Sequence, residues 1–477
     1  MKLSEGMEAS VLQENNNAVT IAIPRHIFRA YDIRGLVKNA LTPVVVKAIG
    51  GAIATEMIHQ GEHHIVVARD GRLSSQSLSE ELITGLQAAG CHVLDIGLVP
   101  TPLLYFATQV LPITFGVMVT ASHNPGDYNG LKIVWQGKTL SEEKLQRLYE
   151  IACKGEFTQG EGSYERQTLV EEYIAAIVDN VQLAKPLKVV VDCGNGAAGE
   201  VTPRVLRRLG CEVVPLYCEI DGRFPHHHPD PGHINNLQDL IERVQQEKAH
   251  VGIALDGDGD RLGVVTDEGT IIWPDRQMML YAEDVLAKHH GATVLFDVKC
   301  SEHLPIIIKK AGGKPLMWKT GHSFIKQKMI ETGALLAGEM SGHIFFKEGW
   351  FGFDDAIYSA ARLLAILSRE TVSCEVVFRR FPDSVNTPEI NIPMADDKKK
   401  KFVDAVIAAG DYFQGEIITM DGIRVNFSDG WGLLRCSNTT PCLVLRFEAK
   451  NKQALARIQQ QFSAVMLQIE PDLVLPF

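Results

Sequence analysis

The sequence lacks the cysteine spacing on which disulfide frameworks and zinc sites are built. Its nine cysteines are scattered over 477 residues, their number is odd, and no C-x-x-C pair occurs. Disulfide-rich domains and structural zinc sites both need cysteines in close, regular spacing. The pattern therefore excludes both classes and predicts a reducing compartment, which we take to be the cytoplasm.

Positive charge is also in short supply. The chain has 47 lysines and arginines against 58 aspartates and glutamates, a formal net charge of −11. An acidic chain is a poor general binder of nucleic acid or of an anionic membrane surface. We expect neither as a partner, and an anionic substrate would need a local concentration of positive charge.

No long apolar run begins the chain, because MKLSEGMEASVLQENNN carries glutamates and asparagines. We therefore expect no signal peptide and interpret residues 1–24 as a mobile tail. Residues 96–122 contain no charged side chain, but Pro100, Pro102 and Pro112 interrupt them. TPLLYFATQVL predicts a helix and ITFGVMVTA a buried strand, so a core α/β unit is favoured over a membrane span.

Three segments share one pattern of an apolar strand, a helix and a second strand. The first strands end at Asp70, Asp192 and Asp297, and the helices end at Gly90, Gly210 and Gly312. Strands that alternate with helices in this way are typical of βαβ units with a largely parallel, buried sheet. The chain is therefore predicted to contain three related α/β domains with mixed, mainly parallel sheets.

The last hundred residues differ from this pattern. The stretch RRFPDSVNTPEINIPMADDKKKK is rich in proline and charge and predicts a linker, with Lys398–Lys401 in a solvated first helical turn. IRVNF, GLLRC and CLVLRFEA predict short antiparallel strands, followed by a helix. We expect a smaller α+β C-terminal domain with an antiparallel sheet, and domains over residues 1–167, 168–270, 271–382 and 383–477.

The stretch LDGDGDR places Asp256, Asp258 and Asp260 at alternate positions with glycines between them. The glycines allow a tight turn in which three carboxylates converge, and their mutual repulsion calls for a cation. Oxygen ligands favour Mg²⁺, Mn²⁺ or Ca²⁺. An EF-hand is excluded because Arg261 stands where its glycine belongs and the flanking segments are strand-like.

Four other stretches carry candidate groups. VTASHNP places Ser122 beside His123 at the end of an apolar run, but neighbouring residues in an extended chain point to opposite sides, so a Ser–His pair does not follow. GEMSGH offers Glu339 and Ser341 for a pair of sugar hydroxyls. The stretch LLRCSNTTP, with an arginine and small donors after a strand, suits a phosphate. FRAYDIRG places Arg29 and Arg34 near the start of the folded region.

Together these motifs, in the order FRAYDIRG, TASHNP, DGDGDR, GEMSGH and SNTTP, resemble the α-D-phosphohexomutase family, most closely its bacterial phosphomannomutase/phosphoglucomutase members. The resemblance covers residues 28–467. It implies a reversible interconversion of hexose 1-phosphate and hexose 6-phosphate, of mannose, glucose or both, through a phosphoserine and a hexose 1,6-bisphosphate. It also implies Mg²⁺ as cofactor, the bisphosphate as activator and hexose phosphates as partners, and we expect a monomer.

The resemblance also assigns residues by position. Ser122 matches the phosphorylated serine and completes the metal site of Asp256, Asp258 and Asp260. The matched catalytic residues of the cleft are His322, Lys132, Lys299 and Arg34, with His322 favoured for proton transfer because its ordinary pKa lies nearest neutrality. The matched substrate-binding residues are Tyr31, Arg261, Glu339, Ser341, His343, Arg435, Ser437, Asn438 and Thr439.

Three other functions stay open from the sequence. A phosphoglucosamine mutase typically carries glutamine in the sugar loop, where this chain has Met340. A phosphatase would pass the phosphate of Ser122 to water. A non-catalytic protein that binds metal or sugar phosphate would not need Ser122. The run His226–His228 lies between prolines, and we interpret it as part of a rigid loop rather than as a metal site.

Overall fold

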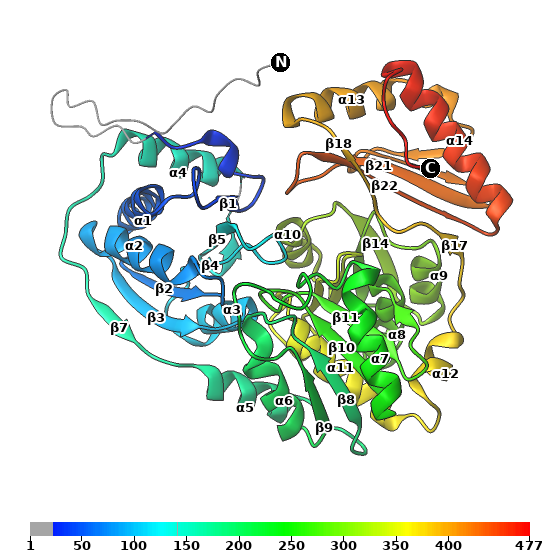
Figure 1. The fold of residues 1–477 in the computed structure, drawn as a ribbon, viewed down its shortest axis with the longest axis horizontal. Coiled ribbons are helices and arrows are strands. Elements are labelled where there is room, and N and C mark those ends of the chain that lie inside the picture. Colours follow the sequence, from blue (N-terminus) through cyan, green and yellow to red (C-terminus); the bar gives the residue numbers. More distant parts are fainter. Residues whose placement is uncertain (1–21, 141) are drawn as a thin grey trace.

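A computed structural model describes residues 22–140 and 142–477. From the sequence, a mobile tail is expected over residues 1–24. Residues 1–21 lie outside the described part, whereas Ile23 is buried in the hydrophobic core of the N-terminal domain. Four sheets with their helices, here called domains I to IV, follow one another around an arc, so that the blue N-terminal and the orange-red C-terminal domains face each other across the top of Figure 1.

Domain I is a seven-stranded mixed sheet in the order β1-β5-β4-β2-β3-β7, with β6 paired to β5. β2 runs parallel to β3 and β4, whereas β5 is antiparallel to its neighbours. Its strands are β1 Ile33–Leu36, β2 His64–Arg69, β3 His92–Leu98, β4 Gly116–Val119, β5 Tyr128–Trp135, β6 Lys138–Thr139 and β7 Tyr164–Arg166. Its helices are α1 Pro43–Ile58, α2 Ser75–Ala88, α3 Thr101–Val110 and α4 Glu142–Lys154.

Domains II and III repeat the arrangement with smaller sheets, β12-β11-β10-β8-β9 and β14-β13-β15-β16. Domain II comprises α5 Val170–Asn180, β8 Lys188–Asp192, α6 Val201–Arg208, β9 Glu212–Leu216, α7 Gln238–Glu247, β10 Val251–Leu255, β11 Leu262–Thr266 and β12 Ile271–Ile272. Domain III comprises α8 Pro274–Lys288, β13 Thr293–Asp297, α9 His303–Lys310, β14 Lys314–Trp318, α10 His322–Thr332, β15 Leu336–Gly338, β16 Ile344–Phe346, α11 Ala356–Arg369 and α12 Cys374–Arg379.

The three predicted strand–helix–strand repeats are present, as β2-α2-β3, β8-α6-β9 and β13-α9-β14, and each pair of strands is parallel. The fold class expected from the sequence is therefore confirmed. The domain boundaries stay a prediction; β12 pairs with β11, so the sheet of domain II continues past the expected boundary at residue 270.

The aspartates that end the first strands organise the loops that follow. Asp70 and Asp192 each accept a hydrogen bond from the backbone N–H two residues on, at 3.0 and 2.8 Å. Asp297 accepts from the Thr320 hydroxyl at 3.0 Å and from the Met340 backbone N–H at 3.2 Å. A carboxylate that bonds to the backbone in this way fixes a turn. The repeated aspartates thus shape the loops around the later site.

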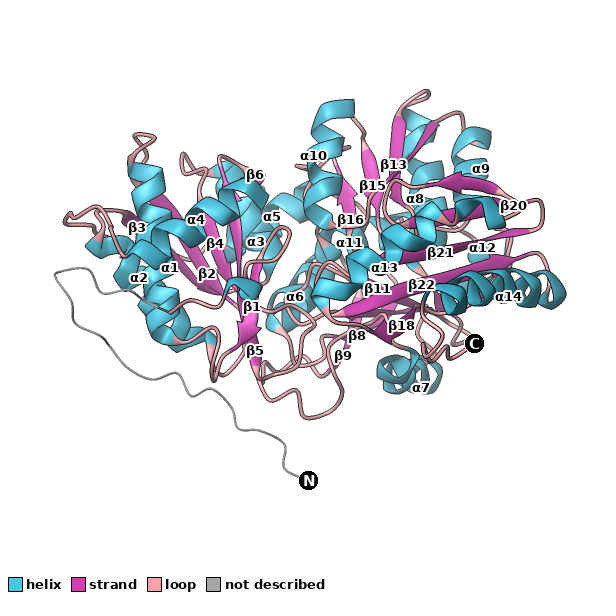
Figure 2. Cartoon of the chain, turned by 90° about the horizontal axis from the view of Figure 1, so that it is seen from above, coloured by secondary structure: helices cyan, strands magenta, loops and turns pink. Residues whose placement is uncertain are grey.

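Domain IV is an antiparallel sheet in the order β17-β22-β21-β20-β19, with β18 also paired to β22. Its elements are β17 Val385–Asn386, β18 Ile390–Pro393, α13 Asp396–Ala408, β19 Glu416–Ile418, β20 Ile423–Phe427, β21 Gly430–Cys436, β22 Cys442–Ala449 and α14 Lys452–Ile469. Helices α13 and α14 lie along β21 and β22 on one side of this sheet (Figure 2).

The segment interpreted as a linker is partly ordered into this sheet, which corrects the expectation. Ile390 and Ile392 alternate along β18 and pair with Leu445 and Leu443 of β22. The strand ends at Pro393, which supplies no further backbone N–H donor. The lysine run does lie in the first turns of α13, mostly exposed, as expected.

The cores of the domains are not independent of one another. One hydrophobic cluster runs from domain I through domains II and III, whereas the core of domain IV is separate. Within the described residues, no helix is long and apolar enough to cross a membrane. The shared core therefore sets domains I to III in fixed relation, whereas domain IV is joined to domain III by a small apolar cluster of Val298, Trp431 and Leu433 and by polar contacts.

Candidate active site

A cavity of about 530 Å³ lies where the four domains meet. It is lined by every predicted site residue except the three metal-loop aspartates: Tyr31, Arg34, Ser122, Lys132, Arg261, Lys299, His322, Glu339, Ser341, His343, Arg435, Ser437, Asn438 and Thr439. Asp256, Asp258 and Asp260 are fully buried and contact residues of its wall. Motifs more than 400 residues apart in the sequence thus converge on one space.

Ser122 lies in the loop after β4 and is 2% exposed. Its Oγ donates to Asp256 Oδ2 at 2.7 Å, and its backbone N–H donates to the Thr120 hydroxyl at 2.9 Å. The residue has a positive φ of 51°, so the chain is not extended there. For this reason the Ser122 Oγ lies 3.2 Å from Nδ1 of His123, a contact that the argument from an extended chain did not expect.

The three aspartates follow β10 in a tight turn. Asp256 Oδ1 accepts the backbone N–H groups of Gly259, Asp260 and Arg261 at 3.0–3.1 Å, which closes the turn. Carboxylate oxygens of Asp256, Asp258 and Asp260 all lie within 4.8 Å of one another. Burial and the two neighbouring charges raise the pKa of Asp256, which is the electrostatic cost of collecting these groups.

The cluster fits a hard divalent cation. Asp258 Oδ1 and Asp260 Oδ1 are buried and have no hydrogen-bond partner among the described residues, so each has lone pairs available for a ligand. The donor set is entirely oxygen, as Mg²⁺ prefers, and Ser122 Oγ borders it. Asp256, Asp258 and Asp260 would hold the ion, with an oxygen on Ser122 completing the set.

Lys132 partly neutralises the cluster from domain I. Its Nζ donates to Asp258 Oδ2 at 2.6 Å and to Asp260 Oδ2 at 2.5 Å. Burial alone would lower the pKa of Lys132. The charges of these two aspartates outweigh burial and raise the pKa, so the side chain stays an ammonium. Thr101, at the start of α3, donates its backbone N–H and its hydroxyl to Asp258 as well. Domain I is thereby fastened to the metal loop of domain II.

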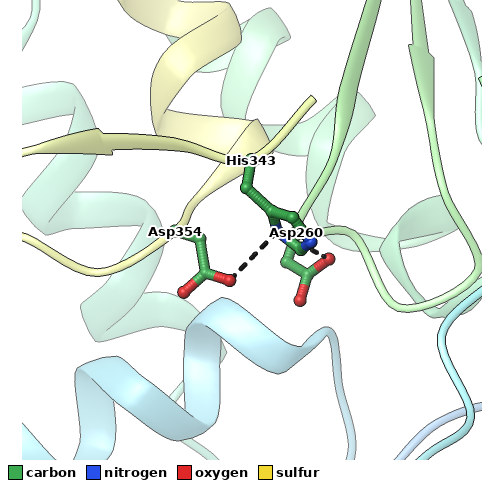
Figure 3. A group of neighbouring side chains, drawn as sticks. All are labelled: Asp260, His343 and Asp354. Carbon is green, nitrogen blue, oxygen red and sulfur yellow. Dashed lines mark ion pairs between the residues drawn. The ribbon is translucent and has the colours of Figure 1, made fainter. Parts of the chain in front are cut away.

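A second group of possible ligands, Asp260, His343 and Asp354, lies beside the first (Figure 3). His343 Nδ1 lies 3.1 Å from Asp354 Oδ2 and 3.5 Å from Asp260 Oδ1, while Arg261 Nε donates to His343 Nε2 at 3.1 Å. Because Nε2 accepts, a neutral ring carries its proton on Nδ1, and a protonated nitrogen is no metal ligand. Lys326 also pairs with Asp354 at 2.9 Å. The three-aspartate cluster is therefore the better cation site.

His322 and Tyr31 form another part of the wall. Their rings pack edge to face with centroids 4.8 Å apart, and His322 Nδ1 lies 3.6 Å from Asp354 Oδ2. Burial, together with the charge of Lys326, lowers the pKa of His322 well below its ordinary value. The imidazole is then neutral near pH 7 and has the protonation state that accepting a proton requires.

The sugar-loop motif is joined to the metal loop by the main chain. Arg261 and His343 form an antiparallel bridge, and the Leu262 N–H donates to the Gly342 carbonyl at 3.1 Å. Glu339 accepts a short hydrogen bond from the Gly321 N–H, and burial raises the pKa of Glu339 to about 7. Its carboxyl group is thus ready to exchange a buried partner for a ligand hydroxyl.

Domain IV supplies the opposite wall. Arg435 Nε donates to Asp421 Oδ2 at 2.9 Å, while its Nη2 is buried without a partner. The Ser437 side chain closes the adjacent turn by accepting the Thr440 N–H at 3.1 Å, and Asn438 reaches the Thr320 carbonyl of domain III at 3.0 Å. An unused guanidinium donor beside a tight turn of small polar residues has the chemistry to bind an anion.

Lys299 enters the cavity from domain III. Its Nζ lies 3.1 and 3.2 Å from the two carboxylate oxygens of Glu389, and it is 3% exposed. Arg34 is held in the same manner, by Asn124 Oδ1 and Asp32 Oδ2, each at 2.6 Å. The cations of the cavity are therefore oriented before any ligand arrives, which lowers the cost of arranging them around a phosphate.

Several supporting residues were missed by sequence reasoning. Arg72 donates to the carbonyls of Ser122, Asn124, Pro125 and Tyr128 and so holds the serine loop. Lys399, part of the lysine run, donates to the carbonyls of Ser437 and Thr440 at 2.7 and 3.0 Å. The signal for Arg72 was its position after the strand end at Asp70. For Asp354 and Lys399 the sequence offered none.

The arrangement combines a buried hydroxyl, an acidic cation site and an anion site on the opposite wall. A hydroxyl between the two charged regions could exchange a phosphoryl group with a substrate, so the cavity is that of a phosphoryl-transfer enzyme.

Comparison with known proteins identifies the family to which this phosphoryl-transfer enzyme belongs. Models of the phosphoglucomutase/phosphomannomutase alpha/beta/alpha domains I, II and III match residues 25–159, 171–269 and 273–384, and the model of the C-terminal domain matches residues 389–465. The chain belongs to the phosphoglucomutase/phosphomannomutase family. This confirms the resemblance found in the five motifs.

Individual relatives agree over the full length. A phosphomannomutase/phosphoglucomutase of Pseudomonas putida is 54% identical over 459 residues, 96% of this chain and 99% of the relative. A phosphoglucomutase of Neisseria meningitidis is 49% identical over 458 residues, 95% and 99% of the two chains. The crystal structure of a phosphoglucomutase/phosphomannomutase family protein from Burkholderia thailandensis matches with a TM-score of 0.91 at 48% identity, covering 96% of this chain and 100% of that one.

The packing of the serine loop on the metal loop can be tested at Gly257. A Cβ added there would lie 2.5 Å from the Ser122 carbonyl oxygen, so Gly257→Ala must push the two loops apart. A displacement of this kind typically costs about 100-fold in rate. We expect kcat to fall by about that factor in steady-state assays with hexose phosphate. Gly126→Ala is the control, because its Cβ would meet nothing closer than 3.5 Å. Equal activity of both variants would contradict the model of the site.

Proposed function

We propose that this chain interconverts hexose 1-phosphates and hexose 6-phosphates through a phosphorylated Ser122 and a hexose 1,6-bisphosphate. The observation that carries the proposal is the position of Ser122 Oγ, 2.7 Å from Asp256 in the acidic cluster and in the same cavity as the anion site at Arg435. Because both residues line one cavity, we infer that a substrate with one phosphate at Arg435 directs its free hydroxyl toward the serine. This geometry suits transfer in both directions.

In the forward half of the reaction, the phosphoryl group leaves Oγ of Ser122 and bonds to the free hydroxyl of the sugar. The P–Oγ bond breaks, a P–O bond to the sugar forms, and the hydroxyl proton passes to a base, for which we favour the neutral His322. The leaving Oγ of Ser122 takes up one proton in exchange and becomes the hydroxyl that donates to Asp256. Lys132 and Arg34 stabilise charge on the transferred group. Mg²⁺ held by Asp256, Asp258 and Asp260 would neutralise phosphoryl oxygens and orient the group for transfer.

In the return half, the bisphosphate lies in the opposite sense and gives its other phosphoryl group to Ser122. Arg435, Ser437, Asn438 and Thr439 then hold the phosphate that was added first, and Lys299 and Arg261 line the path between the two ends. The serine regains its phosphate and the isomeric monophosphate departs. Free hexose 1,6-bisphosphate would restore any enzyme that has lost its phosphate, so we expect it to act as an activator.

We propose that both glucose and mannose phosphates are substrates. Glu339 and Ser341 can bind two neighbouring hydroxyls, whereas Met340 between them has no side-chain donor for a third. A site that does not bind the hydroxyl of carbon 2 discriminates weakly between the epimers, by less than about 100-fold. The relative from Pseudomonas putida is named for both phosphomannomutase and phosphoglucomutase activity, and the relative from Neisseria meningitidis is named as a phosphoglucomutase alone. We also infer a monomer. We infer a cytoplasmic location as well, with which nine free cysteines are consistent.

Ser122→Ala tests the phosphoserine. We expect turnover of glucose 1-phosphate and mannose 1-phosphate to fall by more than about 1,000-fold, because the group that carries the phosphoryl is removed. Phosphate on Ser122 should be found by mass spectrometry in the parent protein only. Ser77→Ala, an exposed serine of α2, is the control. A folded Ser122→Ala enzyme with normal mutase activity would refute the mechanism, and net release of inorganic phosphate by the parent would favour a phosphatase.

Asp258→Asn tests the cation site without relying on activity. In the parent protein, Mg²⁺ should raise the unfolding temperature, since a ligand at 100 times its dissociation constant stabilises the folded state by about 2.7 kcal/mol. We expect Asp258→Asn to lose most of this shift, measured by scanning calorimetry, and to lose activity. Asp411→Asn, at an exposed aspartate of domain IV, should behave like the parent. An undiminished Mg²⁺ shift in Asp258→Asn would exclude the assignment.

The raised pKa of Glu339, about 7, predicts a pH dependence of substrate binding. The ionised carboxylate accepts two hydroxyl hydrogen bonds, so KM should fall as the pH rises through about 7 and should increase toward pH 6. Glu339→Gln should remove this dependence, apart from the titration of the substrate phosphate near pH 6. Glu331→Gln, on the exposed side of α10, should keep it. Identical profiles for the parent and Glu339→Gln would show that another group titrates.

A further inference from the structure

The loop that carries Lys299 into the cavity is bound from behind by domain IV. Three successive carbonyls of this loop accept hydrogen bonds from two arginines. Arg424 Nη1 donates to the carbonyls of Val298 and Cys300 at 2.6 and 3.0 Å, and Arg446 Nη1 donates to the carbonyl of Lys299. The backbone at Lys299 is therefore tied to another domain.

The next residues of the loop are bound as well. Glu448 Oε1 accepts the Ser301 hydroxyl at 2.9 Å and the Glu302 backbone N–H at 3.2 Å. Arg446 also pairs with Asp275 at 3.2 Å, which in turn accepts the Ser301 N–H at 3.0 Å. Every residue from Val298 to Glu302 thus makes at least one hydrogen bond to domain IV.

The side chains of domain IV that bind this loop lie on one face of the antiparallel sheet. Arg424, Leu433 and Arg446 are aligned across β20, β21 and β22, and Asn426, Trp431 and Glu448 form the next row. Alternate residues of the same strands, such as Val425 and Phe447, belong to the separate core of domain IV. Arg435 has the same parity along β21 as Leu433 and Trp431, so the phosphate-binding arginine and the loop-binding arginines share a face.

The side chains that bind the loop are charged and almost completely buried. Arg424, Arg446 and Glu448 are each no more than 2% exposed, and Trp431 is fully buried with the Arg424 guanidinium 3.8 Å from its ring centroid. The hydrogen bonds of Arg424 go to three neutral oxygens, those of Val298, Cys300 and Asn426. A buried cation whose hydrogen bonds all go to neutral oxygens is costly, although the nearby charge of Glu448 offsets part of that cost, and apolar residues would join two domains at lower cost. The presence of the Arg424 guanidinium is therefore better explained by the loop carbonyls that it binds.

We propose that Arg424, Arg446 and Glu448 are positioning residues of the mutase reaction, which hold the Lys299 ammonium in the cavity by fixing the backbone of residues 298–302 to domain IV. The proposal rests on the proposed function, in which Lys299 faces the substrate phosphate. One rigid sheet face then places both Arg435 and Lys299, so that the two cations on this side of the cavity keep a constant spacing while the bisphosphate turns.

A double-mutant cycle between Arg424 and Lys299 tests the coupling. Arg424→Met should lower kcat/KM at least tenfold in the parent enzyme, since the loop loses two hydrogen bonds. In a Lys299→Met background the same change should cost less than twofold, because the group being positioned is already absent. Arg424→Lys retains a cation over Trp431 and one possible carbonyl bond, so it should recover part of the activity.

Hydrogen exchange gives a readout that does not depend on catalysis. In Arg424→Met, amides of residues 298–302 should exchange at least tenfold faster than in the parent, while amides of the metal loop, residues 256–261, should be unchanged. Arg457→Met is the matched control: Arg457 is a half-exposed arginine of α14 that pairs with Asp429, and its replacement should alter neither exchange nor activity.

Each outcome decides a separate point. Unchanged exchange of residues 298–302 in a folded Arg424→Met protein overturns the positioning role. Equal losses from Arg424→Met with and without Lys299 also overturn it, because they indicate a general structural effect. Full activity of Lys299→Met, with Ser122→Ala inactive, overturns the inference but not the mutase. An active Ser122→Ala enzyme with faster loop exchange in Arg424→Met overturns the proposed mechanism instead.

Discussion

Three carboxylates in a buried turn are the constraint on which the rest of the site depends. Asp256, Asp258 and Asp260 are fully buried and repel one another, so the fold must bring positive charge and hydrogen-bond donors to them. Lys132 and Ser122 of domain I meet that demand. The electrostatic repulsion that suits the turn to a cation thus also fixes the position of Ser122, the proposed nucleophile, and the junction of the first two domains.

The two loops that reach into the cavity from domains I and III are stabilised by the same device. Buried arginines donate to several backbone carbonyls of one loop, Arg72 to those of the serine loop and Arg424 and Arg446 to those of the Lys299 loop. A guanidinium has several donors in a rigid plane, so one side chain can hold two or more carbonyls. Such loops suit phosphoryl transfer, because the enzyme contributes mainly by positioning groups and neutralising charge.

Charge in the cavity is balanced rather than simply positive. Arg435 pairs with Asp421, and Lys299 pairs with Glu389. The anions orient the cations before a phosphate arrives and compete with it afterwards. In the proposed mechanism the enzyme must bind a bisphosphate in two orientations and then release a monophosphate, so moderate attraction at each phosphate site would serve turnover better than the strongest attainable binding.

The sequence by itself determined the repeated strand–helix–strand units, the antiparallel last domain, the acidic turn and the order of the motifs, because periodicity, glycine spacing and like-charge repulsion are local properties. Only the tertiary structure decided the left-handed conformation of Ser122 that brings it to His123, and the pairing of β18 with β22 inside an expected linker. It also decided which distant residues, such as Arg72 and Arg424, hold the functional loops. Such contacts join residues 50 to 126 positions apart. The arginines bind backbone carbonyls, which every residue possesses, so no pattern of side chains in the sequence could predict these contacts.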